Sequence, residues 1–397
     1  MMEPTVRFPE FKDSWNNYKI EDMFDRVGTP VDLDDTQTYR EIGIRSHGKG
    51  IFHKEETTAT EIGNKRVFWV EPDCFVVNIV FAWERAVAKT TEKENGMIAS
   101  HRFPMYKPKK DIVDLDYITE YFITKRGQNV LILASPGGAG RNKTLGQKEF
   151  AKSVVKLPSL PEQQKIAEFL STIDTVIEKQ KETVSAWEER KKGMMQKLFS
   201  QEVRFKADDE SEFPDWEKKP FGDVVSEYKV KTKVENEDTL LSCAINGVFL
   251  NSELFGHQRG QSNIGYLKIK KETLILSAQN LHLGNANVNL KFEHGIISPA
   301  YKTYDIVGCS AEYMSQWVKW DMTKQFFYNA TTVGASECRR NVDWNMLYSQ
   351  LLAVPCLAEQ QKIADCLLAL DEVIKNQKAT LSAWEELKKG LLQQMFV

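Results

Sequence analysis

The feature that most constrains the fold of this chain is a 44-residue segment that occurs twice. Residues 157–200 (LPSLPEQQKIAEFLSTIDTVIEKQKETVSAWEERKKGMMQKLFS) align without gaps with residues 354–397 at an offset of 197 residues, and 25 of 44 positions are identical. This offset is close to half of the 397-residue chain. A repeat at this period indicates two copies of one plan, each ending in the repeated segment.

The apolar pattern of the segment predicts a long helix. Alternating steps of four and three residues from Ile166 and Ile363 reach apolar side chains at eight of ten positions in each copy, the a/d pattern of a coiled coil. A helix of roughly 36 residues is about 54 Å long, and Pro158 and Pro355 suit an extended lead-in. We predict that the following residues contact the other helix or a partner subunit: Ile166, Leu170, Ile173, Ile177 and Trp187, and Ile363, Leu367, Leu370, Ile374 and Trp384.

Polar residues interrupt both helices at matching positions, as Gln180 and Gln377 and as Lys191 and Lys388. Such interruptions can fix the register of a coiled coil. One arrangement pairs the helices antiparallel about an internal two-fold, with one globular module at each end. The alternatives are that each helix packs on its own module, or that the apolar faces serve partner subunits.

The segments before the helices also correspond. FPEF (8–11) resembles FPDW (213–216), and GMIASHR (96–102) matches GIISPAY (295–301). We therefore predict an α+β (mixed α/β) fold with two globular modules on two long helices that form an antiparallel coiled coil, related by an internal pseudo-two-fold. The predicted boundaries are 1–156 and 201–353 for the modules, and 157–200 and 354–397 for the helices.

Composition places few further limits. The formal net charge is −3 and no segment is strongly basic, so bulk charge does not indicate a nucleic-acid binder. The six cysteines are scattered without a C-x-x-C pair, which suggests neither a zinc site nor a disulfide framework. No signal-peptide core or membrane-length apolar stretch is present. A soluble, cytoplasmic protein is the expectation.

Two stretches resemble enzyme motifs. In SPGGAGRNKT (135–144), Gly137, Lys143 and Thr144 fall in phosphate-loop register, but Asn142 replaces the second glycine, and the counterpart TTVGASECRRN (331–341) lacks the Lys and Thr. The shared feature is a Gly-Ala turn followed by cations and Asn. Pro214-Asp215 and Glu227-Tyr228-Lys229 spell a nuclease-like pattern, but Pro9-Glu10 in the first copy has no such sequel. Nucleotide hydrolysis and metal-assisted cleavage are both disfavoured.

The repeated LP-x-L-x-EQQKIA…W-E-E-x-K-K-G segment, the FPEF/FPDW openings and the half-chain duplication resemble the specificity subunit of type I restriction–modification systems. This resemblance implies two target recognition domains that each read one half of a bipartite DNA sequence. It implies that the helices set the half-site spacing and dock two methyltransferase subunits, and that a restriction/translocase subunit joins the complex. A coiled-coil adaptor without a DNA role and an enzyme are the competing classes.

The resemblance also assigns the chemistry to other chains. The chain itself is expected to be a non-catalytic, membrane-free DNA-recognition subunit without a cofactor or metal. S-adenosylmethionine is expected on the methyltransferase subunits, where a flipped base would be methylated, and ATP and Mg²⁺ on the restriction subunit.

Candidate DNA contacts are cationic and amide side chains on glycine-rich or loop segments, because Arg and Lys suit guanine edges and phosphates while Asn and Gln suit adenine. Each also has an ordinary reading as a solvated loop residue or, for His101, a structural histidine. The candidates are Arg45, His47, Lys49, Arg85, His101, Arg102, Arg141, Asn142 and Lys143 in the first copy, and Arg259, Gln261, Asn280, Arg339, Arg340 and Asn341 in the second. Asn263 belongs to the same stretch as Gln261.

Overall fold

The chain was described from a computed structural model that covers residues 4–137, 143–255, 262–336 and 339–396, with the side chains of residues 333–339 left undescribed. It divides into two compact units. Unit 1 comprises residues 1–181 and 380–397, and unit 2 comprises residues 182–379. Both long helices, α6 (Leu160–Phe199) and α11 (Leu357–Met395), run from one unit into the other, so each unit contains part of both.

Unit 1 is a mixed α/β module built on a four-stranded sheet, a five-stranded sheet and a two-stranded ribbon. The strand orders are β2-β10-β7-β8, β3-β6-β9-β4-β5 and β1-β11. Its strands are β1 (Asn16–Lys19), β2 (Phe24–Val27), β3 (Thr29–Pro30), β4 (Thr38–Ile44), β5 (Ile51–Thr58), β6 (Val67–Trp69), β7 (Phe75–Val77), β8 (Val87–Lys89), β9 (Ile98–Ser100), β10 (Met105–Pro108) and β11 (Val154–Leu157). Its helices are α1 (Ile20–Met23), α2 (Ala59–Ile62), η1 (Ala82–Glu84), η2 (Glu92–Glu94), α3 (Leu115–Ile123), α4 (Lys125–Leu133) and α5 (Gln147–Lys152).

Unit 2 repeats this plan. Its four-stranded sheet has the order β13-β20-β17-β18 and its ribbon is β12-β23, while the remaining strands form the pairs β14-β15, β16-β19 and β21-β22. Its strands are β12 (Glu217–Pro220), β13 (Val225–Glu227), β14 (Leu241–Ala244), β15 (Gly247–Leu250), β16 (Leu267–Lys270), β17 (Leu274–Ser277), β18 (Ala286–Val288), β19 (His294–Ile297), β20 (Tyr301–Ile306), β21 (Thr331–Ser336), β22 (Arg339–Val342) and β23 (Leu351–Val354). Its helices are η4 (Phe221–Asp223), α7 (Asn251–Leu254), η5 (Leu281–Leu283), α8 (Ala311–Trp317), α9 (Asp321–Asn329) and α10 (Trp344–Ser349).

Short helices begin in the same way in both units, because a polar side chain caps a free backbone N–H. Asp114 accepts from the N–H of Tyr117 at the start of α3, and Ser310 accepts from the N–H of Tyr313 at the start of α8. Both caps lie 196 residues apart, close to the offset of the long repeat. The duplication therefore includes the globular modules as well as the long helices.

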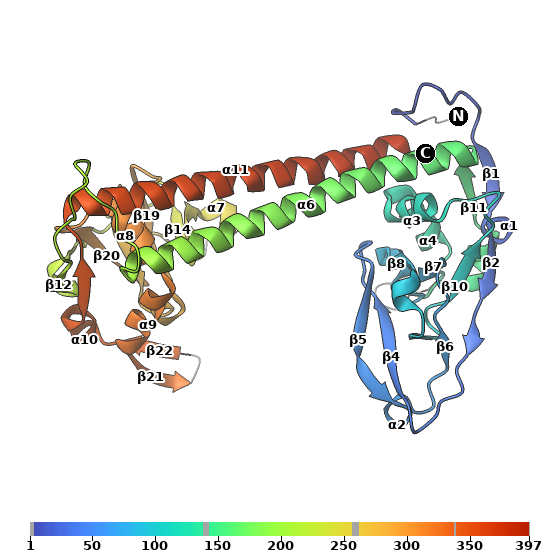
Figure 1. Ribbon diagram of the computed structural model, residues 1–397, viewed down its shortest axis with the longest axis horizontal. Coiled ribbons are helices and arrows are strands. Elements are labelled where there is room, and N and C mark those ends of the chain that lie inside the picture. The colour runs from blue at the N-terminus through green and yellow to red at the C-terminus, as the bar shows by residue number, and fades with distance from the viewer. Residues whose placement is uncertain (1–3, 138–142, 256–261, 337–338, 397) are drawn as a thin grey trace. The chain divides into compact units, whose positions relative to one another are not determined.

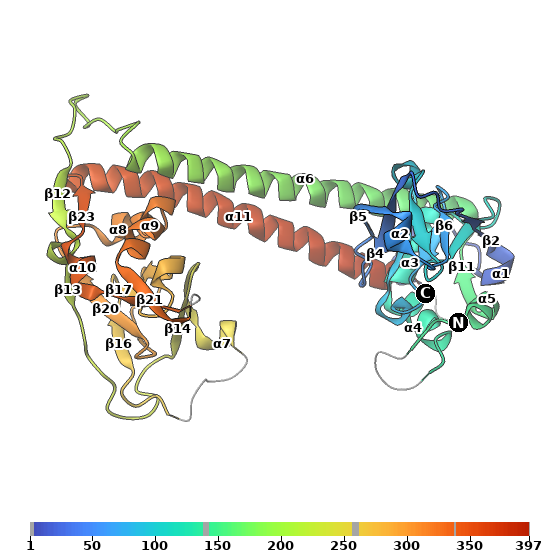
Figure 2. The same cartoon turned by 90° about the horizontal axis from the view of Figure 1, so that it is seen from below.

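The two long helices run antiparallel and side by side in each unit (Figures 1 and 2). In unit 2, Glu188 pairs with Lys378 and Lys191 with Asp371, so numbers rise along α6 as they fall along α11. In unit 1, Lys388 of α11 pairs with Asp174 of α6. With 40 and 39 residues, the helices are longer than the roughly 36 residues that the sequence suggested.

Each long helix begins on its own module and ends on the other module. The core of unit 1 takes in Ile166 and Leu170 from the start of α6, together with Met395 at the end of α11 and the following Phe396. The core of unit 2 takes in Ile363 and Leu367 from the start of α11, and its α6 residues are Met195, Leu198 and Phe199. Packing between helices and packing on a module therefore occur together rather than as alternatives.

Most predicted seam residues of the helices are buried. Ile166, Leu170, Ile173, Ile177, Ile363, Leu367 and Ile374 are each at most 8% exposed. Leu370, Trp187 and Trp384 are only half-buried. The half-buried indole of Trp187 lies against the guanidinium of Arg190, 5.2 Å from the ring centre.

The segment before SPGGAGRNKT lies in helix α4 up to Leu133, so no strand precedes the glycines as a phosphate loop requires. The expectation of a turn at Gly334 and Ala335 is wrong. They lie in strand β21, where the pairing with β22 shifts register between Val333 and Ser336. A bulge in a hairpin replaces the predicted turn.

Candidate functional site

The cationic candidates of unit 1 converge on one segment, residues 78–86. The loop between β4 and β5 lies against its end, because the N–H of His47 donates to the carbonyl of Glu84 at 2.7 Å and that of Gly48 to the carbonyl of Arg85 at 2.9 Å. The hydroxyl of Ser46 also donates to the carboxylate of Glu84 at 2.9 Å. The loop that carries the candidates Arg45, His47 and Lys49 and the segment that carries Arg85 therefore form one surface.

Two further candidate segments join the other end of residues 78–86. The N–H of Ile79 donates to the carbonyl of Arg102 at 3.0 Å, and the N–H of Leu145 donates to the carbonyl of Ile79 at 2.8 Å. Arg102 and Lys143 consequently lie on segments that share a neighbour. Among the candidates of unit 1, the side chains of Arg45, His47, Lys49 and Arg102 are exposed, and Lys143 is half-buried.

Two candidates of unit 1 are held by the fold. Arg85 has a φ of 59°, in the left-handed region, and its Nη1 donates to the carbonyl of Ile123 at 3.0 Å. His101 is half-buried beside Phe68 and Phe103 in a pocket of about 200 Å³, and its backbone N–H donates to the carbonyl of Arg66 at 3.0 Å. The Nδ1 of His101 is buried without a partner among the described residues.

In unit 2 the candidates lie on η5 and on the β21–β22 hairpin. Asn280 is exposed at the start of η5, and Asn341 is exposed on β22. Arg340 is engaged within the hairpin, because its guanidinium donates to Thr331 Oγ1 at 2.7 Å and to the carbonyl of Thr331 at 2.9 Å. It also stacks on the ring of Tyr328 at 4.0 Å.

The two segments of unit 2 are close enough to interact electrostatically. Burial, and secondly the charge of Arg340, lower the pKa of His282 in η5. The charge of Arg340 on the hairpin therefore reaches η5, whereas no hydrogen bond among the described residues joins the two segments.

None of the remaining candidates has an exposed side chain among the described residues. Arg141, Asn142, Arg259 and Gln261 lie outside the described residues, and Arg339 is placed only as the first residue of β22. Asn263 is 1% exposed, and its amide bonds with Asn236 while its carbonyl accepts from Thr232. Its side chain serves the fold of unit 2 and is not available to an external ligand.

The EQQ triplet that opens each long helix is a structural clamp, which the sequence did not reveal. The guanidinium of Arg7 donates to both carboxylate oxygens of Glu162 at 2.7 and 2.8 Å, and Arg204 does the same to Glu359 at 3.0 and 2.8 Å. Both carboxylates are almost fully buried. The missed signal is the tripeptide Val-Arg-Phe, which occurs at 6–8 and again at 203–205, at the same offset of 197 residues.

The glutamine that follows the clamp carboxylate joins the helix to its module. Gln163 accepts from the N–H of Asp114, the cap of α3, at 3.0 Å. Gln360 accepts from the N–H of Ser310, the cap of α8, at 2.7 Å. The motif therefore positions each module on its helix, and it is part of the scaffold rather than of a ligand site.

The lysines that interrupt the helix seams are paired with acids of the other helix. Lys191 lies 2.6 Å from Asp371, and Lys388 lies 2.8 Å from Asp174 and 3.3 Å from Glu120. The residue equivalent to Glu120 is Gln316, which donates to Asp371 at 3.1 Å. Each pair connects copy one of the repeat with copy two, in agreement with an antiparallel register.

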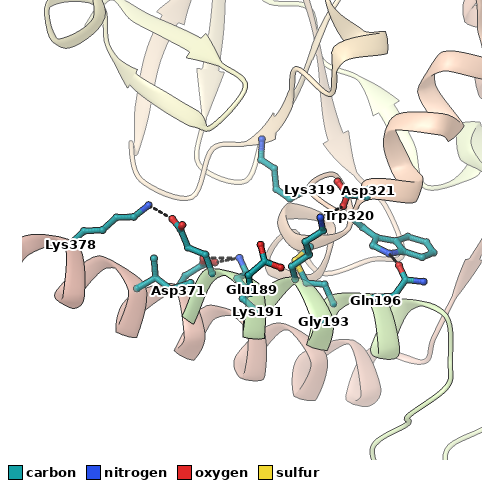
Figure 3. A pocket seen from close by; sticks show the side chains of 13 residues that line it. Glu189, Lys191, Gly193, Gln196, Lys319, Trp320, Asp321, Asp371 and Lys378 are labelled. Carbon is teal, nitrogen blue, oxygen red and sulfur yellow. Dashed lines mark hydrogen bonds and ion pairs between the residues drawn. The ribbon is translucent and has the colours of Figure 1, made fainter. Parts of the chain in front are cut away.

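A pocket lies beside each of these ion pairs. In unit 2 it measures about 680 Å³, between α6, α11 and the α8–α9 junction (Figure 3). Lys319 and Trp320 line it, and the indole N–H of Trp320 donates to Gln196 at 3.0 Å. Lys319 directs its ammonium to the carbonyls of Ile245 and Ala286 at 2.6 and 2.8 Å, and burial lowers its pKa to about 8.

Among the described residues, no cluster of catalytic side chains corresponds to the phosphate-loop motif or to the nuclease-like motif. Asp215 pairs with Arg204 at 3.7 Å, and Glu227 ends strand β13. No group of three or more His, Cys, Asp or Glu within the described residues could hold a metal ion. A search of the same residues for a helix of the length and apolarity needed to cross a membrane found none.

Comparison with known proteins is consistent with this architecture. Residues 12–185 match the family model of the type I restriction modification DNA specificity domain. The S subunit of a type I restriction–modification system from M. genitalium is 13% identical, with a TM-score of 0.56, over 100% of this chain and 99% of that chain. A chain from a structure on complex assembly and conformational transition of the type I R-M system is also 13% identical, with a TM-score of 0.57, over 98% of both chains. These structures show a shared fold.

Proposed function

Residues 12–185 belong to the type I restriction modification DNA specificity domain family, and from this premise we propose that each module of the chain reads one half of a bipartite DNA target. The family supplies DNA recognition as the function. The assignment of one half-site to each module is our inference, and so are the module boundaries at residues 1–156 and 201–353.

The observation that carries this proposal is the duplication of the scaffold without duplication of the candidate surface. The four-stranded sheets, the caps of α3 and α8 and the Arg–Glu clamps recur in both units. The candidate loops do not recur, because the β4–β5 loop (45–50) carries Arg45, His47 and Lys49, whereas the β14–β15 loop (245–246) carries no cation. Two different surfaces on one repeated scaffold suit two different half-sites.

The long helices are proposed to set the spacing of the half-sites. At 1.5 Å per residue, the 40 residues of α6 are about 60 Å long, which is enough for half-sites about one DNA turn apart or more. Two modules joined by a stiff element raise each other's effective concentration on DNA only when the half-site separation fits. The Lys191–Asp371 and Lys388–Asp174 pairs support this role because they fix the register of the helices.

The catalytic steps are proposed to belong to partner subunits. Two methyltransferase subunits carrying S-adenosylmethionine would dock on the helices, and a restriction/translocase subunit would bring ATP and Mg²⁺. The chain itself would act as a non-catalytic reader, and partner cations would add phosphate contacts to a chain whose net charge is −3. The half-buried Trp187 and Trp384 are candidate docking residues, since aromatic side chains are enriched at interfaces.

Methylome sequencing of a host that expresses the chain with its methyltransferase subunit tests the proposal. We expect methylation at a bipartite motif with a fixed unspecified spacer. Changing Arg340 should degrade only one half of the motif, because this side chain belongs to unit 2, where it contacts Thr331 and Tyr328. Equal loss at both halves would contradict the modular account, and methylation without any sequence dependence would favour an adaptor. Cleavage of DNA or hydrolysis of ATP by the purified chain alone would indicate an enzyme.

A further inference from the structure

The pocket of unit 1 beside the helix ion pair differs in charge from its counterpart in unit 2. It measures about 570 Å³ and contains four cationic side chains, Arg85, Lys125, Lys388 and Lys389, against one carboxylate, Glu385. The pocket of unit 2 contains four lysines and four carboxylates, and is therefore balanced. The excess positive charge is a property of unit 1 alone.

The helix side of the two pockets is largely repeated, whereas the module side has changed. Arg85 directly follows η1, and its counterpart directly after η5 is Gly284. Lys125 is the first residue of α4, and its counterpart at the start of α9 is Asp321. The two module residues of unit 1 therefore contribute two positive charges, whereas Lys319 and Asp321 of unit 2 cancel each other. The rest of the difference comes from the helix side, because Glu189, Asp371 and Lys378 line only the pocket of unit 2.

Arg85 adopts a backbone conformation that arginine rarely adopts. Its φ of 59° is a conformation that suits glycine, and Gly284 adopts it at 83°. The guanidinium is fixed by one hydrogen bond to the carbonyl of Ile123 at 3.0 Å, while its Nε is buried without a partner among the described residues. An N–H group that is buried and unpaired costs free energy until an acceptor arrives.

The cations of the pocket fall into two classes. Lys388 is neutralised by Asp174 and Glu120, and Lys389 by Glu386. Within the described residues, neither Arg85 nor Lys125 has a carboxylate within ion-pair distance. Lys125 also begins α4, so the positive end of that nine-residue helix faces the same region as these two side chains.

We propose that this pocket binds a phosphate group, and that in the complex the group is a phosphodiester of the DNA backbone. The second part rests on the proposed function. The pocket is continuous with the predicted DNA surface, because the N–H of Gly48 donates to the carbonyl of Arg85 at 2.9 Å and the exposed Arg45, His47 and Lys49 lie on the same loop. Arg85 and Lys125 thus position the duplex and do not read its bases.

The test uses the full chain in its complex with the methyltransferase subunits and compares Arg85→Gly and Lys125→Gln with wild type. Arg85→Gly keeps the backbone conformation, since glycine already occupies the equivalent position, and melting curves will verify folding. Binding is measured to duplexes with and without the methylated motif over a range of KCl concentrations. Lys192→Gln is the matched control, because it removes one lysine from the balanced pocket of unit 2.

We expect each variant to bind both duplexes more weakly by the same factor and to lower the slope of log K against log [KCl] by about one. Lys192→Gln should leave the slope unchanged. Unchanged slopes for both unit 1 variants, with intact sequence-specific binding by wild type, would overturn the phosphate site and leave the proposed function standing. If a variant no longer discriminates between the duplexes, the phosphate site is overturned and the changed side chain reads bases instead.

A second arm separates the pocket from the DNA role. Inorganic phosphate is titrated into the complex without DNA, and melting temperatures are recorded for wild type and Arg85→Gly. If the wild-type complex binds no duplex, the proposed function fails. In that case, a phosphate-induced rise in the melting temperature of wild type but not of Arg85→Gly would still support a free phosphate as the occupant of the pocket. Equal responses of wild type and Arg85→Gly in that case would overturn the pocket as well.

Discussion

Arg7 and Glu162 lie 155 residues apart in the sequence, and two parallel hydrogen bonds join them at 2.7 and 2.8 Å. This bidentate pair fixes the segment that leads into module 1 to the first turn of α6. The carboxylate is only 1% exposed, so it depends on its partner for neutralisation. Arg204 and Glu359 repeat the arrangement in unit 2 with one addition, because the indole N–H of Trp216 also donates to Glu359 at 3.0 Å.

The first prediction uses this difference between the clamps. Arg7→Met should lower the free energy of unfolding of unit 1 by about 3 kcal/mol, since it leaves Glu162 buried and unpaired. Arg204→Met should cost less, because Trp216 still donates to Glu359. Urea denaturation of the two variants checks the order. A larger loss for Arg204→Met would show that the indole contributes nothing to the clamp.

The second prediction concerns the lysines of the helix seam. Lys388→Met should destabilise the chain by about 2–3 kcal/mol, because it leaves Glu120, whose side chain is 19% exposed, without a cation. Lys191→Met should cost only about 1 kcal/mol, since Asp371 is 43% exposed and keeps its bond from Gln316. The measurement is again denaturant unfolding of the single variants. Equal losses would contradict the distinction between the two pairs.

The third prediction is a pH dependence confined to unit 1. Burial raises the pKa of Glu120 above its ordinary value, Lys388 opposes the shift, and Asp174 and Asp116 add to it. A carboxyl with a raised pKa stabilises the fold when protonated, and this contribution is lost as the pH rises through its pKa. Glu120→Gln should therefore melt at a higher temperature than wild type at pH 7, and the gap should close as the pH falls below 4.5.

The control for this prediction is present in the chain. Gln316 occupies the position in unit 2 that Glu120 occupies in unit 1, and it faces the corresponding Lys191 and Asp371. Gln316→Glu should introduce the same pH dependence into unit 2. Its loss of stability relative to wild type should be larger at pH 7 than at pH 4. Parallel melting curves for wild type and Glu120→Gln at all pH values would refute the assignment.

The long helices and the duplication were predictable because both depend on patterns within the sequence. The steps of four and three residues identified buried positions such as Leu170 and Leu367, and the lysines that broke the pattern do lie at ion pairs. The partners of those lysines were not predicted, since the recurrence of Asp174 and Asp371 at the same offset does not show which side chains meet. Local periodicity and internal comparison are sufficient for the helices and the duplication.

The candidate surface was less predictable, because it is made by contacts between distant segments. Nothing in the order of residues indicates that Gly48 bonds to Arg85, or that Arg340 is engaged by Thr331. The Gly-Ala pair of unit 2 was interpreted as a turn, yet pairing with β22 draws it into a strand. Tertiary pairing outweighs the local preference of glycine there.

The last prediction concerns the loop that joins the candidate surface of unit 1 to the phosphate pocket. Gly48 has a φ of 67°, and a Cβ there would lie 2.7 Å from the side chain of Ile123. Gly48→Ala should therefore shift residues 45–50 away from Arg85, cost about 1–3 kcal/mol, and reduce binding of DNA that carries the half-site of module 1. Gly50 is the matched control, because its φ is 74° but a Cβ would meet nothing within 4 Å. Gly50→Ala should show the backbone strain alone, about 1 kcal/mol, and should retain DNA binding. Equal losses of binding in the two variants would contradict a role of this loop in the DNA surface.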